Sequence, residues 1–310
     1  MLKCILFLLN QYLIIVENVL EINNLSKNYG SLQAVHNVSF SVKKGEVYGI
    51  LGPNGSGKTT TLAVILGVLN ANDGDFKWFD QPLRKETRQR IGSLIETPNF
   101  YPYLTLYENL QIVAKIKNVS EESINNALGI ANLLKRKHTN FSTLSLGMKQ
   151  RMALASVLIG DPEVLVLDEP TNGLDPEGFA EVRNIIQSQA AKGKTIILAS
   201  HILDEVEKVC SHVAILKSGE LIANGRVGEL LTTEDIVFIQ SNNQDDLFAV
   251  LQMSDMIQKI TKVDDDLSVV LKKQYAVSEL NKFCFEKGFI LSKIILRKQS
   301  LEAQFLELVK

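Results

Sequence analysis

The sequence contains Gly52-Pro53-Asn54-Gly55-Ser56-Gly57-Lys58-Thr59, which follows the pattern G-x-x-x-x-G-K-[ST] of a phosphate-binding loop. An apolar run at 47–51 predicts a buried strand before it, and apolar spacing over 60–69 predicts a helix after it. Glycines would let backbone N–H groups converge on phosphate oxygens near the positive end of that helix. Lys58 would reach the β- and γ-phosphates, and Thr59 would ligate Mg²⁺. The alternative, a glycine-rich turn without a ligand, leaves the flanking strand and helix unexplained.

Two carboxylates follow a second apolar run, Val164-Leu165-Val166-Leu167. Such a run predicts a central parallel strand, and ligands bind at the carboxyl ends of strands in open α/β sheets. Asp168 suits Mg²⁺ there, and Glu169 suits orienting or deprotonating a water molecule. Without the glycine loop, a pair of solvated acids would be the simpler interpretation. His201 follows a predicted strand at 195–199; a lone histidine is usually structural, but its place beside the other groups favours a role in the site.

Helix boundaries add three further candidates. Ser145 is placed to cap a helix over 146–159, and Gly147 in its first turn would let a ligand approach the backbone closely. Asp175 precedes a proline and starts another helix that runs to about residue 191. Tyr29 precedes a glycine in a position where its ring could stack on a base, although an isolated tyrosine more often serves packing.

Length and composition limit the number of domains, the partners and the cellular compartment that we expect. With 310 residues and 45% hydrophobic content, the chain predicts one large globular domain and a smaller one. A net charge of −2 disfavours nucleic acid as a partner. The cysteines at 4, 210 and 284 have neither disulfide-framework nor zinc spacing, which favours a reducing compartment. The sequence has no apolar run long enough to span a membrane.

The first 18 residues form an apolar extension before the first predicted strand at 19–22. It is interrupted by Asn10-Gln11 and lacks a small-residue cleavage site, which disfavours secretion. A tail that touches a membrane or partner and a structureless extension both stay open, as does translation that begins near Val16.

A helical insertion is expected over about 96–160, within an otherwise alternating strand-and-helix pattern. Its first part, Thr97-Pro98-Asn99-Phe100-Tyr101-Pro102-Tyr103, joins two prolines to three aromatic residues and cannot form a regular helix. Aromatic residues on such a loop often mark a contact surface. Ser120 is expected to cap a helix that starts after it.

Together these motifs resemble the ATP-binding subunit of ABC transporters over about 19–230. Leu144-Ser145-Leu146-Gly147-Met148 matches the family signature, 164–169 the Walker B strand, 172–175 the D-loop, and His201 the switch histidine. The resemblance implies a P-loop α/β ATPase cassette with a helical subdomain, at the cytoplasmic face of the cell membrane. It further implies ATP and Mg²⁺ as cofactors, a second cassette copy as partner, and a separate multi-spanning permease.

The resemblance also assigns roles residue by residue. Glu169 and His201 would be catalytic, and Thr59, Glu96 and Asp168 would hold the metal. ATP binding would fall to Tyr29, Gly52, Pro53, Asn54, Gly55, Ser56, Gly57, Lys58, Thr59, Thr60, Ser145, Gly147 and Asp175. In the family, the signature of one copy contacts the nucleotide held by the other.

The sequence departs from the family pattern at three positions. Glu96 stands where the family usually has a glutamine, and Leu146 and Met148 differ from the usual signature. The variant SLGMKQR at 145–151, together with IETPNFYPYLT at 95–105, resembles the subgroup that exports peptide antibiotics such as bacitracin and lantibiotics. That subgroup often confers self-immunity.

Residues 235–310 follow a different pattern, β-α-β-β-α-β, which predicts a small α+β domain of ferredoxin-like arrangement. Asp264-Asp265-Asp266 is the expected hairpin turn, and a last helix is expected from Ser300. No catalytic motif occurs in it, so its expected role is regulatory or dimer-stabilising.

Two other functions compete with the transporter: a soluble cassette ATPase acting on ribosomes or DNA, and a metabolic P-loop kinase. The first usually has two cassettes or long coiled coils, and the second leaves the signature unexplained.

Overall fold

The computed structural model describes residues 17–96, 99–230, 235–272 and 274–298. The chain divides into two compact units, Met1–Leu230 and Leu231–Lys310. Each is described by itself. Residues 1–16 of the apolar extension, Thr97, Pro98 and the helix expected from Ser300 lie outside the described residues. Asn18, the last residue of the predicted extension, already begins the first strand.

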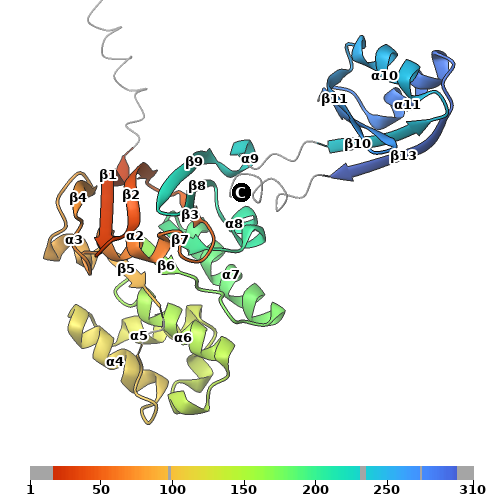
Figure 1. Cartoon of the computed structure of the whole chain (residues 1–310). Coiled ribbons are helices and arrows are strands. Elements are labelled where there is room, and N and C mark those ends of the chain that lie inside the picture. Colours follow the sequence, from red (N-terminus) through yellow and green to blue (C-terminus); the bar gives the residue numbers. More distant parts are fainter. Residues whose placement is uncertain (1–16, 97–98, 231–234, 273, 299–310) are drawn as a thin grey trace, which may run out of the picture. The chain divides into compact units, whose positions relative to one another are not determined.

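A six-stranded sheet in the order β5-β6-β7-β3-β8-β9 forms the centre of the first unit (Figure 1). Its strands are β3 (Val47–Leu51), β5 (Ile91–Leu94), β6 (Val164–Asp168), β7 (Thr195–Ser200), β8 (His212–Lys217) and β9 (Glu220–Arg226). All neighbours are parallel except the β8–β9 hairpin. Every residue of β3, β6 and β7 is buried, as their continuous apolar runs predict.

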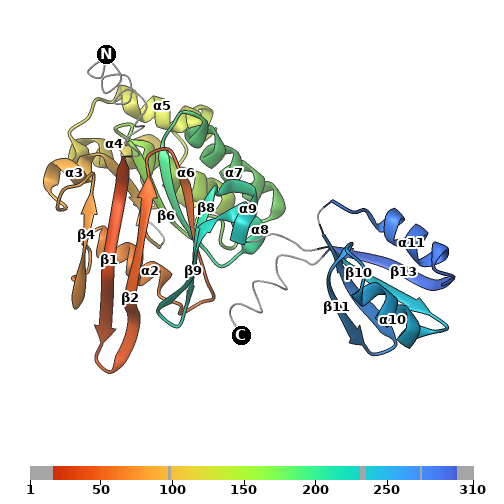
Figure 2. The same cartoon turned by 90° about the horizontal axis from the view of Figure 1, so that it is seen from above.

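A second, antiparallel sheet in the order β2-β1-β4 lies beside the first, and Figure 2 shows its long strands in red and orange. Its strands are β1 (Asn18–Tyr29), β2 (Leu32–Lys43) and β4 (Asp73–Trp78). Helix α2 (Lys58–Ile65) packs against strands of both sheets, and one apolar core joins all three. The buried Trp78 indole donates to Ile65 O over 2.7 Å, which fixes β4 to the end of α2. The helix ends four residues earlier than the predicted Leu69.

The predicted helical insertion comprises α4 (Leu106–Lys117), α5 (Glu122–Ile130) and α6 (Leu146–Leu158), joined by the short 3₁₀ helices η1 (Leu134–Arg136) and η2 (Phe141–Thr143). Figure 1 shows these helices together at one end of the unit. Thr105 caps α4 through Glu108 N, whereas the expected cap at Ser120 is wrong: Glu121 precedes α5 and its side chain makes no capping bond.

The remaining helices of this unit are α3 (Lys85–Gln89), α7 (Pro176–Ala191), α8 (Leu203–Val209) and α9 (Val227–Leu230). In the described residues no helix is both long and apolar enough to span a bilayer.

Lys117, at the end of α4, connects this helix to α6 by hydrogen bonds. Its ammonium donates to Val157 O over 3.3 Å and to Ile159 O over 2.8 Å, at the end of α6. Burial lowers the pKa of Lys117 to about 8. The half-buried ammonium is therefore harder to keep charged in the folded chain than in the unfolded chain, where the pKa is about 10.4.

This depressed pKa predicts a pH-dependent stability. Between about pH 8 and pH 10 the unfolded chain binds more protons at this site, so the free energy of unfolding rises with pH by at most about 1.4 kcal/mol per unit. Buried Cys284, whose pKa is raised to about 11, opposes this trend, so the measurement is the difference between wild type and Lys117→Met in urea melts. A difference that does not grow with pH would contradict the prediction.

The second unit has a four-stranded antiparallel sheet in the order β11-β12-β10-β13. Its elements are β10 (Asp235–Ser241), α10 (Gln244–Gln252), β11 (Ile257–Val263), β12 (Asp266–Leu271), α11 (Val277–Glu286) and β13 (Leu291–Lys298). This is the β-α-β-β-α-β order and strand arrangement of a ferredoxin-like fold. Its core contains Val237, Leu247, Leu267 and Leu280, from two strands and both helices. Asp264 and Asp265 form the β11–β12 turn, but Asp266 already belongs to β12.

Candidate functional site

The glycine loop connects β3 to α2, and two of its glycines have no room for a side chain. A Cβ at Gly52 would lie 2.3 Å from Leu216 O, and one at Gly57 would lie 2.5 Å from Ala34 O. Gly57 also has a φ of 99°, which a residue with a Cβ rarely adopts. No side chain caps α2, so its first N–H groups point into the loop without a capping acceptor. This arrangement suits an anion such as a phosphate.

Lys58 is buried and lies under the loop. Its ammonium donates to Gly52 O over 2.8 Å and to Pro53 O over 3.2 Å, and it pairs with Glu169 Oε1 at 3.3 Å. The positive charge is thus fixed between the loop and the end of β6. A phosphate group within the loop would lie close to this charge.

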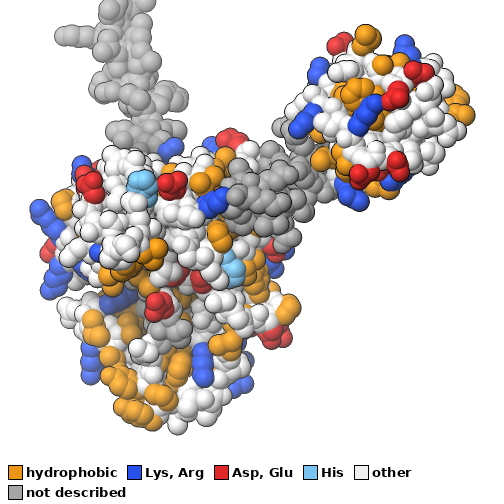
Figure 3. Space-filling view, viewed as in Figure 1, with side chains coloured by type: hydrophobic (Ala, Val, Ile, Leu, Met, Phe, Trp, Pro, Cys, Tyr) orange, Lys and Arg blue, Asp and Glu red, His pale blue; other side chains and the backbone are white. Residues whose placement is uncertain are grey.

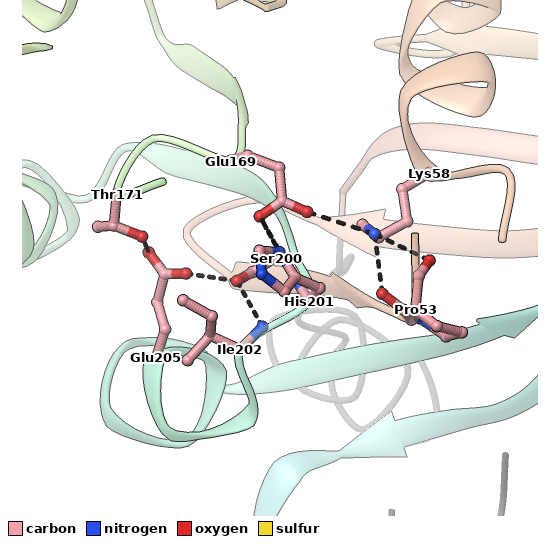
Figure 4. A network of polar contacts seen from close by, with 9 residues as sticks. Pro53, Lys58, Glu169, Thr171, Ser200, His201, Ile202 and Glu205 are labelled. Atoms are coloured by element: carbon pink, nitrogen blue, oxygen red, sulfur yellow. Dashed lines mark hydrogen bonds and ion pairs between the residues drawn. The ribbon is translucent and has the colours of Figure 1, made fainter. Parts of the chain in front are cut away.

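Glu169 connects the lysine to the histidine, as Figure 4 shows. Its Oε1 faces Lys58, while its Oε2 lies 2.8 Å from His201 Nδ1 and 3.4 Å from the His201 backbone nitrogen. The backbone of Glu169 has a φ of 45°, in the left-handed region, and its N–H donates to Ala199 O. This backbone conformation is costly for a residue with a side chain, and such residues cluster at functional sites.

Asp168 and Thr59 meet beside this network. Burial raises the pKa of the Asp168 carboxyl, the Thr59 hydroxyl bound to it acts in the opposite direction, and the negative charges of Glu169 and Glu96 raise it further. Asp168 Oδ1 is buried and accepts no hydrogen bond from the part of the chain that the structure describes. A buried carboxylate oxygen without a partner, next to a hydroxyl and further carboxylates, suits a divalent cation.

The site would supply only part of the coordination shell of a metal ion. Among the described residues no three His, Cys, Asp or Glu side chains form a complete metal cage. Mg²⁺ is usually held by one or two carboxylates with water and substrate phosphates, so Thr59 and Asp168 are sufficient protein ligands for it. Glu96 has a φ of 54° and lines the same cavity of about 610 Å³ as Thr59, Asp168 and Glu169.

Ser145 and Asp175 lie elsewhere in the same unit. The hydroxyl of Ser145 caps α6 by accepting from Met148 N, and the carboxylate of Asp175 caps α7 by accepting from Gly178 N over 2.8 Å. Together with Gly147 they line a cavity of about 390 Å³, which no residue of the glycine loop lines. Leu146 lines both this cavity and the one that contains Thr59. One copy of the chain therefore does not bring these residues to its own phosphate loop.

The other predicted residues are placed as follows. Tyr29 ends β1 with 47% of its surface exposed, and the Lys27 ammonium lies 5.7 Å from its ring centre. Asn54 and Gly55 lie exposed on the loop, and Ser56 is buried with an unpaired hydroxyl oxygen. Thr60 lies half-buried in the first turn of α2.

Comparison with known proteins agrees with this geometry. A family model described as ABC transporter matches residues 35–172. The bacitracin transport ATP-binding protein BcrA of Enterococcus faecalis is 34% identical over 304 residues, which cover 96% of this chain and 98% of that protein. The chain belongs to the ABC transporter ATP-binding proteins. It is an ATP-binding subunit of an ABC transporter, and the activity of such a cassette is ATP hydrolysis coupled to transport.

A further relative and a solved structure each match about two thirds of this chain. The lantibiotic transport ATP-binding protein SrtF of Streptococcus pyogenes is 40% identical over 207 residues, covering 66% of this chain and 89% of that protein. The structure of cbiO1 from Clostridium perfringens, part of the ABC transporter complex cbiONQ, matches with a TM-score of 0.63 and 31% identity, covering 69% of this chain and 90% of that chain. The predicted fold class, family and subgroup resemblance are confirmed.

Sequence reasoning missed the short helices of this ABC cassette, and one of them carries a residue beside the site. Helix α8 was not predicted, and neither was its buried Glu205, which contacts Thr171 and Ser200 beside the site. The apolar positions Leu203 and Val206, three residues apart after His201, were the available signal for a helix. They indicate which side of α8 is buried, but a buried carboxylate on it has no sequence signal.

Proposed function

We propose that this cassette powers export of a peptide antibiotic, or a chemically similar compound, through a separate membrane permease. The observation that carries the proposal is the match to the bacitracin transport protein, which covers nearly the whole of both chains, the second unit included. The subunit would work at the cytoplasmic face of the membrane, as a peripheral protein.

The contacts of Lys58, Asp168 and Glu169 support the following roles in hydrolysis. The glycine loop and Lys58 bind the phosphates of ATP, and Tyr29 stacks on the base. Thr59, Asp168 and Glu96 hold Mg²⁺, which neutralises charge on the phosphates when bound. Glu169 orients and deprotonates the attacking water, and His201, bound to the other oxygen of Glu169, fixes the direction of that carboxylate. Positioning and charge stabilisation are the main protein contributions to phosphoryl transfer.

A second copy of the chain completes the proposed site. Ser145, Gly147 and Asp175 line a cavity apart from the phosphate loop of their own copy. In a head-to-tail dimer, they meet the nucleotide held by the partner. The first turn of α6, where Ser145 already accepts from Met148 N, would then add its remaining N–H groups to the γ-phosphate. ATP would close this dimer, and hydrolysis would release it.

The aromatic loop before α4 is the proposed contact with the permease. Tyr101 and Tyr103 are 49% and 71% exposed, and their rings lie 5.8 Å apart. Buried Asn109 holds the loop, because its side chain accepts from Tyr101 N and donates to Tyr101 O. Ile112 and Ile116 on α4 are exposed as well, and Figure 3 shows hydrophobic side chains gathered over this end of the unit. Aromatic residues held on a rigid frame are favourable anchors for a partner.

Purification from native membranes tests the proposal. We expect the cassette to co-purify in detergent with a multi-spanning membrane protein, and a bacitracin-like or lantibiotic peptide to stimulate ATP hydrolysis by that complex. Ribosomes or DNA in place of a membrane protein would favour the soluble ATPase and contradict export.

A further inference from the structure

Two loops that carry site residues leave neighbouring strands. The loop with Glu169 and Thr171 follows β6, and the segment with Ser200 and His201 ends β7. The two strands pair in parallel, with Asp168 opposite Ala199. Strand pairing ends there. The Glu169 N–H still donates to Ala199 O, and side-chain contacts join the loops beyond that bond.

Glu205 of α8 contacts both loops, as Figure 4 shows. The Thr171 hydroxyl donates to Glu205 Oε1 over 2.7 Å, and the Ser200 hydroxyl donates to Glu205 Oε2. The Ile202 backbone nitrogen in turn donates to the Ser200 hydroxyl over 3.0 Å. One carboxylate therefore spans the two loops, two residues from Glu169 on one side and one residue from His201 on the other.

This carboxylate is buried, with only 1% of the residue exposed. Burial raises its pKa, whereas the two hydroxyl donors act in the opposite direction. A buried carboxyl is costly to desolvate, and hydrogen bonds to both oxygens offset part of that cost. An apolar residue would fill this space at lower cost, so filling the core does not by itself explain a glutamate here.

Helix α8, which carries Glu205, packs closely on strand β3. A Cβ on Gly49 would lie 2.9 Å from Val206 Cγ1 and 3.1 Å from Cys210 Sγ, so the glycine lets α8 lie directly on β3. That strand leads into the phosphate loop, and Gly52 N donates to Ser200 O over 3.3 Å. Helix α8 is thus tied to the strand that holds the nucleotide loop.

We propose that Glu205 is a positioning residue for ATP hydrolysis, which holds the Glu169 loop and the His201 segment at the separation that keeps their side chains hydrogen-bonded. This inference rests on the proposed roles of Glu169 and His201. In this role Glu205 contacts neither ATP nor the attacking water, and it acts through Thr171 and Ser200. Displacement of catalytic groups by about 1 Å can slow a reaction by about 10²-fold.

Three substitutions test the proposal in the full-length chain. Glu205→Gln keeps the shape but leaves one acceptor oxygen where two hydroxyls donate. Thr171→Val and Ser200→Ala each remove one donor. Glu207→Gln, an exposed glutamate on the same helix, is the matched control. We expect kcat to fall about 10- to 100-fold in the first three variants, with Kd for ATP unchanged within about twofold because Lys58 and its loop are intact.

Combination of the variants separates positioning from a general loss of stability. In the Glu205→Gln background, Thr171→Val and Ser200→Ala should lower kcat further by less than about twofold, because the link between the loops is already lost. Independent, multiplying effects, or a lower Tm with an unchanged kcat, would overturn the inference.

Controls distinguish this inference from the function on which it rests. A wild-type chain that binds no ATP would overturn both. Loss of hydrolysis in Glu169→Gln together with wild-type kcat in Glu205→Gln would overturn this inference alone and leave the proposed function standing.

Discussion

Glu169→Gln is expected to lower the rate of ATP hydrolysis by about 10²- to 10⁴-fold, the usual range for loss of a general base. The amide keeps the size of the side chain but cannot take a proton from water. It also removes the negative charge that Lys58 contacts at 3.3 Å. Binding of ATP should persist, because the loop and the ammonium remain and the lysine loses only a competing partner.

The measurements are steady-state ATPase assays, calorimetric binding of ATP and the size of the complex in solution. The variant should form a dimer in the presence of ATP that does not dissociate, since the γ-phosphate is not removed. Glu207→Gln serves as the control for loss of a glutamate charge. Hydrolysis by Glu169→Gln at the wild-type rate would show that another group activates the water.

Replacement of both Tyr101 and Tyr103 by serine should abolish export and release the cassette from the permease. Both rings are largely exposed, so their removal costs the isolated subunit little stability, and its Kd for ATP should stay unchanged. Pull-down from membranes, an export assay and thermal melts are the measurements. Full membrane association by the folded double variant would contradict docking through this loop.

Two control variants separate docking from packing. Phe100 is half-buried, and its ring centre lies 5.0 Å from that of Phe141. Phe100→Ser should therefore lower the Tm of the isolated subunit, unlike the tyrosine changes. Phe285, which is exposed in the second unit, offers an aromatic of similar exposure, and Phe285→Ser should leave membrane association unchanged.

Local sequence patterns were sufficient to predict the strands and helix caps that position the candidate site residues. Strands β3 and β6 are buried on both faces, so their apolar runs are continuous. The run at 47–51 coincides with β3, and the run at 164–167 ends one residue before the end of β6. Ser145 and Asp175 cap helices as predicted, because capping depends on residues three positions apart. Short helices such as α3 and α8 escaped prediction, since five and seven residues offer too few turns for a periodic signal.

Contacts between distant residues were beyond such patterns. The link from Thr171 through Glu205 to Ser200 depends on where α8 lies, and its packing on β3, β7 and α7, with Val206 over Gly49, determines that. The separation of Ser145 from its own phosphate loop is likewise a property of the folded unit. Sequence patterns predicted candidate site residues, but which of them line the same cavity depends on the tertiary structure.

The left-handed backbone of Glu169 bears on how this protein loses activity by mutation. A residue with a side chain costs about 1–2 kcal/mol in that conformation, and glycine avoids the cost. Glu169→Gly therefore removes the carboxylate and this backbone cost together. Chains inactivated in this way would accumulate as folded protein and compete with intact copies for permeases. At this position a loss of catalysis would thus act as a dominant trait in a cell that carries both versions, rather than as a recessive one.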